Sequence, residues 1–111
     1  MQIRVHREDA AVNAEMIAFI ERRLYLSLGR FGGRLRSAVV SLRELNGSGG
    51  GPGGVTRECH VSVRFTHGGT VAITERHGEM REAVARAVER TARTVSRKIS
   101  LMRPFDSDPA A

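Results

Sequence analysis

Short segments of this chain alternate apolar and polar residues, and this spacing predicts β-strands. Apolar side chains recur at every second position in four segments, at residues 2–6, 38–43, 59–65 and 71–73. A period of two places these side chains on one face of a strand. The alternation is clearest in the third segment, where four apolar residues interleave with three polar ones. Each predicted strand therefore has a single apolar face to bury.

Two longer segments have the three-and-four spacing of an α-helix. The first begins near Ala14 with Asn13 as a candidate N-cap, and it ends near residues 30–33, where two glycines supply a stop. The second begins near residues 78–80, has acidic residues in its first turn and runs to about Leu101. The apolar stripes are Ile17, Ile20, Leu24, Leu28 and Phe31 in the first helix, and Met80, Val84, Ala87, Val88, Val95 and Ile99 in the second.

The order of these elements is β-α-β-β-β-α, which predicts an α+β fold. The first helix connects two strands as a right-handed parallel crossover, and hairpins join the later strands, so we expect a mixed four-stranded sheet. Because each strand has one apolar side, both helices must cover the same face, which gives a two-layer sandwich. We expect one folded domain at residues 1–103 and a short flexible tail at residues 104–111.

A glycine-rich connection at residues 46–54 separates the second and third strands. Its glycines fit the spacing G-x-G-x-x-G of dinucleotide-binding proteins. That motif needs the N-terminus of a helix to receive the pyrophosphate, whereas a strand follows here. We therefore interpret the segment as a flexible hairpin loop.

Charge indicates the class of partner. Among 111 residues, 18 lysines and arginines against 12 aspartates and glutamates give a net charge of +6, which favours a polyanion. Most of the cations are arginines, which suit phosphate groups and stack on bases, so nucleic acid is favoured over a membrane. Four arginines recur on the second helix at steps of four, three and four and therefore share one face. Acids do not alternate along this stripe, so we expect its charges to be unpaired. The stripe is Arg86, Arg90, Arg93 and Arg97.

Candidate catalytic groups are few. The single cysteine, Cys59, cannot form an internal disulfide, and it lies on the apolar face of its strand, where an inert core thiol is expected. His60 lies on the opposite face, which removes the simplest Cys-His pair. The other histidines show no spacing that would build a metal site. We therefore expect no metal, no cofactor and no enzymatic activity.

The chain also lacks the signals of a membrane or secreted protein. No apolar stretch is long enough to span a bilayer, and residues 1–9 lack the apolar region of a secretory signal. A lone cysteine fits a reducing compartment. We expect a soluble, cytoplasmic protein.

The ordered set of segments resembles the ribosome hibernation-promoting factor family, which includes ribosome-associated inhibitor A. The resemblance covers nearly all of residues 1–100. It rests on the start MQIRV, on the segment IERRLYLSLGRFGGRLRSAVVSL, on the run LNG...GGVTRECHVSVRF followed by GGTVAITE, and on the closing helix EMREAVARAVERTARTVSRK.

The resemblance implies a function and a set of contact residues. It implies binding to the small ribosomal subunit and its ribosomal RNA, in the channel where messenger and transfer RNA meet, so that an idle ribosome is kept from initiating. The family's basic positions on the last helix match Arg90, Arg93 and Arg97, and Arg86 and Lys98 extend that surface. On the first helix, the family is commonly basic at Arg22 and Arg23, and Arg30 lies at the end of that helix.

Some features depart from the family pattern, and other functions stay open. Family members often carry an aromatic and acidic residues near the start of the second helix, where this chain has Arg81 and HGEM. The sequence ends soon after this helix, so we expect a short form without the family's C-terminal dimerisation domain, monomeric away from the ribosome. The alternatives are a general double-stranded RNA-binding module without ribosome specificity, and a homodimer formed through the sheet edge or the uncovered sheet face.

Overall fold

The described chain forms one sheet and two helices in the predicted order. A computed structural model describes residues 1–7, 12–46 and 55–106. Almost all of the predicted glycine-rich loop, and residues 107–111 of the predicted tail, lie outside the described residues. The elements are β1 (Gln2–Arg7), α1 (Ala14–Leu28), the 3-10 helix η1 (Gly29–Arg34), β2 (Leu35–Asn46), β3 (Val55–Phe65), β4 (Thr70–His77) and α2 (Met80–Asp106).

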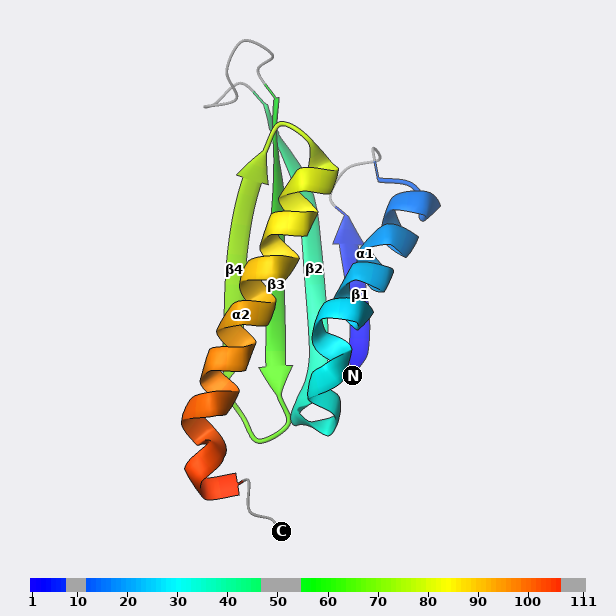
Figure 1. Cartoon of the computed structure of the whole chain (residues 1–111). Helices are drawn as coiled ribbons and strands as arrows, with labels where there is room; N and C mark the ends of the chain where they lie inside the picture. The colour runs from blue at the N-terminus through cyan, green and yellow to red at the C-terminus, as the bar shows by residue number, and fades with distance from the viewer. Residues whose placement is uncertain (8–11, 47–54, 107–111) are drawn as a thin grey trace.

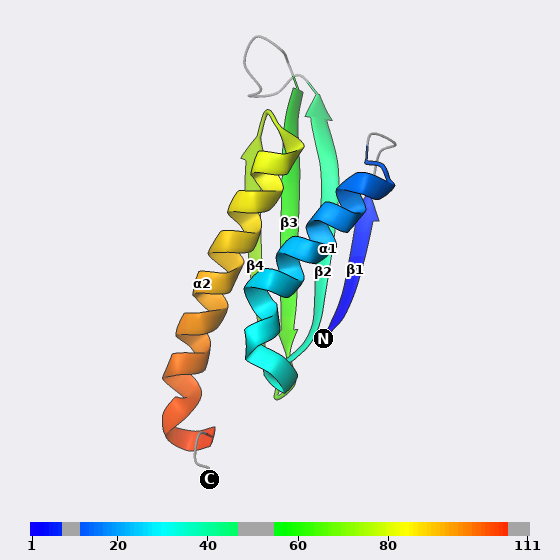
Figure 2. The ribbon, with the colours of Figure 1, turned by 45° about the vertical axis from the view of Figure 1, so that its right-hand side comes forward.

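The sheet has the mixed topology that the element order predicts. Its strands lie in the order β1-β2-β3-β4. β1 runs parallel to β2, whereas β3 is antiparallel to both of its neighbours. Figures 1 and 2 show α1 and α2 side by side on one face of the sheet, and neither covers the opposite face. The predicted α+β two-layer sandwich is confirmed.

Alternate side chains of β3 form the centre of the core. In the strand register, Val61 lies between Val40 of β2 and Ile73 of β4, and all three are buried. Burial of these aliphatic groups is the main favourable term for a domain of this size. The helices complete the core with Ile20, Leu24 and Leu28 from α1 and with Met80, Val84, Ala87, Val88 and Val95 from α2.

Local signals set both ends of α1. Asn13 caps its first turn, because its side-chain oxygen accepts a hydrogen bond from the Met16 N–H at 2.9 Å. The α-helix ends at Leu28, and η1 then leads the chain into β2. Within η1, Gly32 has a φ of 56°, a left-handed conformation that glycine adopts without steric cost. The predicted N-cap is confirmed, and the predicted glycine stop makes the turn into the sheet.

β2 and β3 are longer than the apolar alternation predicts, because charged pairs extend their hairpin. Glu44 and Arg57 face each other in the register, with Arg57 Nε 3.3 Å from a carboxylate oxygen of Glu44. At the neighbouring pair of positions, Arg43 Nε donates to Glu58 at 2.7 Å. Opposite charges at facing positions stabilise an antiparallel pair. The ladder therefore continues beyond the alternating apolar segment, as far as the pair of Asn46 and Val55.

α2 ends at Asp106, five residues beyond the predicted end near Leu101. Pro104 lacks a backbone N–H, which favours a helix end. In a helix of 27 residues, however, a proline so close to the terminus removes a single backbone donor, and the last turn still forms. Figures 1 and 2 show that this end of α2 extends beyond the sheet. Within the described residues, neither helix is long and apolar enough to cross a membrane.

The buried face of β3 can be tested with one pair of substitutions. We expect Val63→Asp to unfold the protein, because the Val63 side chain is fully buried and an unpaired carboxylate there costs several kcal/mol, comparable with the stability of a small domain. Ser62→Asp is the matched control, since Ser62 lies on the open face one position away. Thermal melts followed by circular dichroism measure both. Equal melting temperatures for the two variants would contradict the assigned faces.

Candidate nucleic-acid interface

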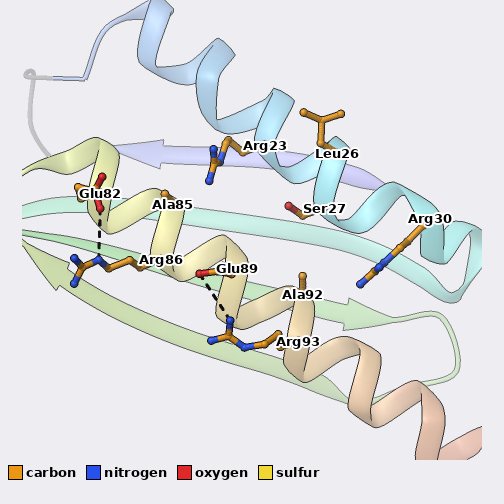
Figure 3. Close-up of a pocket in the computed structure, with 10 residues that line it drawn as sticks. All are labelled: Arg23, Leu26, Ser27, Arg30, Glu82, Ala85, Arg86, Glu89, Ala92 and Arg93. Atoms are coloured by element: carbon orange, nitrogen blue, oxygen red, sulfur yellow. Dashed lines mark ion pairs between the residues drawn. The ribbon is translucent and has the colours of Figure 1, made fainter.

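A groove between α1 and α2 gathers arginines from both helices. It has a volume of about 630 Å³, and Figure 3 shows its side chains arranged along the two facing helices. α1 and η1 supply one wall, and α2 supplies the other. The lining residues are Arg23, Leu26, Ser27, Arg30, Glu82, Ala85, Arg86, Glu89, Ala92 and Arg93.

Small side chains leave room for this groove. Ala85 and Ala92 are seven residues apart, or about two turns, so they lie on the same face of α2. Ala92 is buried, and Ala85 and Ser27 are half-buried, whereas the charged residues around them are exposed. Short side chains therefore form the deep part of the groove and long arginines form its rim. A phosphodiester backbone could lie between the two rims.

The groove is cationic although it contains acids. Four arginines and two glutamates line it, which leaves a formal charge of +2. Arg86 and Arg93 stand on α2, and Arg23 and Arg30 stand on the other wall (Figure 3). A guanidinium group presents a planar fork of donors that matches the oxygens of a phosphate. The arrangement therefore suits an extended polyanion that contacts both walls.

The expectation that the stripe is unpaired is wrong, because acids do stand one turn before two of its arginines. Arg86 Nε lies 3.5 Å from Glu82, and a terminal nitrogen of Arg93 lies 3.8 Å from Glu89. All four side chains are more than half exposed, so water and salt screen these pairs. Exposed pairs of this spacing contribute about 0.3–0.5 kcal/mol. A phosphate can therefore replace the glutamates at little cost.

Arg90 differs from the rest of the stripe because it forms an ion pair with a largely buried glutamate of the sheet. Its guanidinium group forms a short ion pair with Glu75 on β4 and also donates to the Thr74 carbonyl at 3.5 Å. Glu75 is the more buried partner, with its side chain 20% exposed. Arg90 thus ties α2 to the edge strand of the sheet and lies outside the groove.

Three other predicted contact residues are exposed but do not line the groove. Arg22 follows the core residue Ile20 by two positions, which places it on the outer side of α1. Arg97 continues the stripe one turn beyond Arg93, whereas Lys98 lies about 100° further around the helix. Within the described residues, no hydrogen bond or ion pair engages Arg22, Arg97 or Lys98. Of the eight predicted contacts, the groove unites Arg23, Arg30, Arg86 and Arg93.

An aromatic residue on α1, Phe19, contacts one arginine of the groove and one arginine of α2. The sequence patterns did not predict these contacts. The guanidinium carbon of Arg81 lies 4.6 Å from the centre of the Phe19 ring, and that of Arg23 lies 5.7 Å from it. Such contacts hold a cation over a ring. Phe19 thereby links the first turn of α2 to α1. No local pattern reveals this link, since it joins residues that are 62 positions apart in the chain.

The candidate catalytic groups are arranged as expected for structural residues. Cys59 is fully buried, and burial, with a smaller contribution from the charge of Glu58, raises the pKa of its thiol to about 12. His60 lies on the opposite face of β3, where its Nδ1 is 2.7 Å from Thr74 Oγ1. Within the part of the chain that the structure describes, no group of three potential metal-ligating side chains comes together.

Solved structures share this fold, although their sequences differ widely from this one. No family model and no curated protein matches the chain. The N-terminal domain of Protein Y from Thermus thermophilus matches with a TM-score of 0.69 at 22% identity, over 88% of this chain and 99% of that domain. A ribosomal subunit interface protein from Coxiella burnetii matches with a TM-score of 0.72 at 12% identity, over 90% and 99%. At these identities the comparison establishes the fold alone. The fold agrees with the family resemblance seen in the sequence.

The inert state of Cys59 can be tested by thiol labelling. With a pKa of about 12 in place of 9.0, the native thiol is deprotonated about a thousandfold less than an unfolded one near pH 8. We expect a disulfide reagent to label the native protein only at the rate at which it opens, and to label it at once in denaturant. Rapid native labelling at pH 8, in a protein shown to be folded by circular dichroism, would contradict the core position of Cys59.

Proposed function

We propose that this chain is a hibernation factor that binds the small ribosomal subunit and its ribosomal RNA. It occupies the channel where messenger and transfer RNA meet, and it thereby inhibits translation. The observation that carries this proposal is the cationic groove between α1 and α2. The fold shared with a ribosomal subunit interface protein supports the choice of the ribosome as the polyanion.

The groove favours recognition of RNA shape and backbone. Its cationic groups are all guanidinium groups, which bind phosphate strongly at any physiological pH. Contacts to phosphate fix the position of a protein without reading the base sequence. Phosphate contacts are sufficient to recognise one fixed site on a folded RNA, because the shape of the RNA already distinguishes that site from others. The net charge of +6 adds a long-range attraction that speeds the encounter.

Inhibition by this route requires no chemistry. A protein seated in the channel excludes other ligands by overlap, and its effect follows mass action. We accordingly propose a cytoplasmic protein that acts without enzymatic activity or a cofactor and is monomeric away from the ribosome. The uncovered face of the sheet is mainly polar, as expected of a surface that no second copy must bury.

Two double variants with the same change in charge test the groove. Arg86→Gln with Arg93→Gln removes two groove cations, and Arg4→Gln with Arg64→Gln removes two exposed cations from the open face. We expect the groove variant to bind small subunits about tenfold more weakly or worse, because each lost phosphate contact also loses the release of a counterion. The slope of log affinity against log salt should fall by about 0.7–0.9 per contact. Pelleting of the protein with purified subunits over a salt series measures both quantities.

Competition with free duplex RNA distinguishes a factor specific for the ribosome from a protein that binds RNA in general. We expect a large excess of free duplex RNA at physiological salt to leave binding to the subunits intact. Efficient competition by the duplex would instead identify a general double-stranded RNA-binding module. Equal retention of the two double variants, both folded by circular dichroism, would refute the groove as the binding surface.

A further inference from the structure

The two walls of the groove hold their arginines in different ways. Both glutamates that line the groove, Glu82 and Glu89, stand on α2, and each pairs with an arginine one turn further along. The wall formed by α1 and η1 contributes Arg23 and Arg30 and no acid. Glu21, two residues before Arg23, lies about 200° away around the helix. The formal charge of +2 in the groove therefore belongs to Arg23 and Arg30.

Aromatic rings hold these two arginines without neutralising them. The guanidinium carbon of Arg30 lies 4.7 Å from the centre of the Phe31 ring. That of Arg23 lies 5.7 Å from the centre of the Phe19 ring. Both rings are half-buried and pack against the core. A ring restrains a cation but, unlike a carboxylate, leaves its positive charge in place. Among the described residues, no ion pair or hydrogen bond engages either guanidinium group.

A serine lies between the two arginines on the same wall. Arg23, Ser27 and Arg30 follow one another at steps of four and three residues, which places them on one face. Figure 3 shows both arginine side chains extending from this wall toward α2, which carries Ala85 and Ala92. Alanine side chains are short, so the guanidinium groups and the serine hydroxyl border the open part of the groove.

The hydroxyl group of Ser27 is available to a ligand. In α2, Thr91 and Thr94 each donate their hydroxyl to the carbonyl oxygen four residues earlier. Ser27 makes no such bond, and within the part of the chain that the structure describes its hydroxyl has no hydrogen-bond partner. Ser27 is half-buried and lines the groove, so a ligand in the groove can accept a hydrogen bond from it.

We propose that Arg23, Ser27 and Arg30 form the primary phosphate site of the groove, and that Phe19 and Phe31 position its arginines. This inference rests on the proposed function and names the residues that hold the RNA backbone most strongly. The two arginines are seven residues apart, or about 10 Å along the helix, whereas a stacked strand rises about 3.4 Å per nucleotide. Arg23 and Arg30 therefore contact different phosphates of one strand, and the Ser27 hydroxyl donates between them.

The competing explanation is that every arginine of the groove contributes equally, through its charge alone. The rings would then only complete the core, and Ser27 would be an ordinary helical serine. The two explanations differ in rank, because a phosphate that binds Arg86 or Arg93 must first displace a glutamate. A phosphate that binds Arg23 or Arg30 displaces no carboxylate of the described residues.

Two double variants with the same change in charge test this ranking. Arg23→Gln with Arg30→Gln removes the unpaired cations, and Arg86→Gln with Arg93→Gln removes the paired ones. We expect the first variant to bind small subunits about threefold more weakly than the second, or worse, because its lost contacts had no internal competitor. Pelleting measures both affinities, and circular dichroism confirms that both variants are folded. Equal affinities, or weaker binding by the second variant, would overturn the assignment.

Titration of the free protein with a short oligouridine strand at low salt, followed by amide NMR, tests the site without a ribosome. We expect saturable shifts at Arg23, Ser27 and Arg30, and about threefold weaker binding in Ser27→Ala because a phosphate loses one donor. Ser100→Ala is the matched control, since Ser100 is an exposed serine of α2 outside the groove. Equal affinities in the two serine variants, or no saturable shifts at the three residues, would contradict the site.

A double-mutant cycle tests Phe31 as a positioning residue for Arg30. Phe31→Leu removes the ring and keeps an apolar side chain. We expect it to weaken oligouridine binding about twofold or more in the native protein and to have no effect beside Arg30→Gln. Phe31→Tyr keeps the ring and should retain native affinity. A purely structural ring would give equal losses in the two backgrounds, and that result would refute the positioning role.

The same measurements separate this inference from the proposed function. If both double variants lose subunit binding to the same extent and Ser27→Ala behaves as Ser100→Ala does, the primary site is refuted and the proposed function stands. If neither double variant loses subunit binding, the proposed function itself fails. The oligouridine titration requires no ribosome, so it decides the phosphate site in either case.

Discussion

The structure depends on one constraint, which is that each strand has a single apolar face. β3 lies between β2 and β4. Its alternate residues Cys59, Val61 and Val63 are buried on the side of the sheet that the helices cover. A helix packed on the other side would meet Ser62 and the buried charge of Glu58. Both helices are therefore confined to the same side, where they must lie next to each other. The groove that gathers the arginines is a consequence of that confinement.

The described arginines discussed above fall into two groups. One group forms ion pairs with buried or partly buried carboxylates of the sheet, and the other lines the groove with exposed partners. Arg90 binds Glu75 at the sheet edge, and Arg43 and Arg76 hold Glu58 on the open face. Among the residues that the structure describes, the arginines at the rim of the groove have exposed, screened glutamates or aromatic rings as partners. A side chain in the second group can exchange its partner for phosphate with little loss of stability. Charge alone therefore does not identify a contact residue, and the burial of its partner is the better guide.

The sequence predicts the fold well because the relevant signals are local. Alternation at residues 59–65 fixes the faces of β3, and Asn13 marks the start of α1. The ends of elements are harder to predict, since the β2–β3 hairpin is extended by charged pairs between distant residues such as Glu44 and Arg57. Pro104 likewise lies inside the last turn of α2, although proline favours a stop.

Only half of the candidate site could be predicted, because the other half depends on contacts between residues that are far apart in the chain. Helical periodicity places Arg86, Arg90 and Arg93 on one stripe, but it does not show that Arg90 reaches across to Glu75. Nor does it show that Arg23 and Arg30 face that stripe across a groove. The pairs Glu82–Arg86 and Glu89–Arg93 were within reach of sequence reasoning, because both have the i,i+4 spacing of helical ion pairs.

The most direct test of the account is a cryo-electron microscopy structure of the protein bound to the small ribosomal subunit. The account predicts that the outer surface of the α1–α2 layer faces ribosomal RNA within the messenger and transfer RNA channel, with Arg86 and Arg93 at hydrogen-bonding distance from phosphate oxygens. A complex in which that surface faces solvent, or in which the protein sits outside the channel, would contradict it.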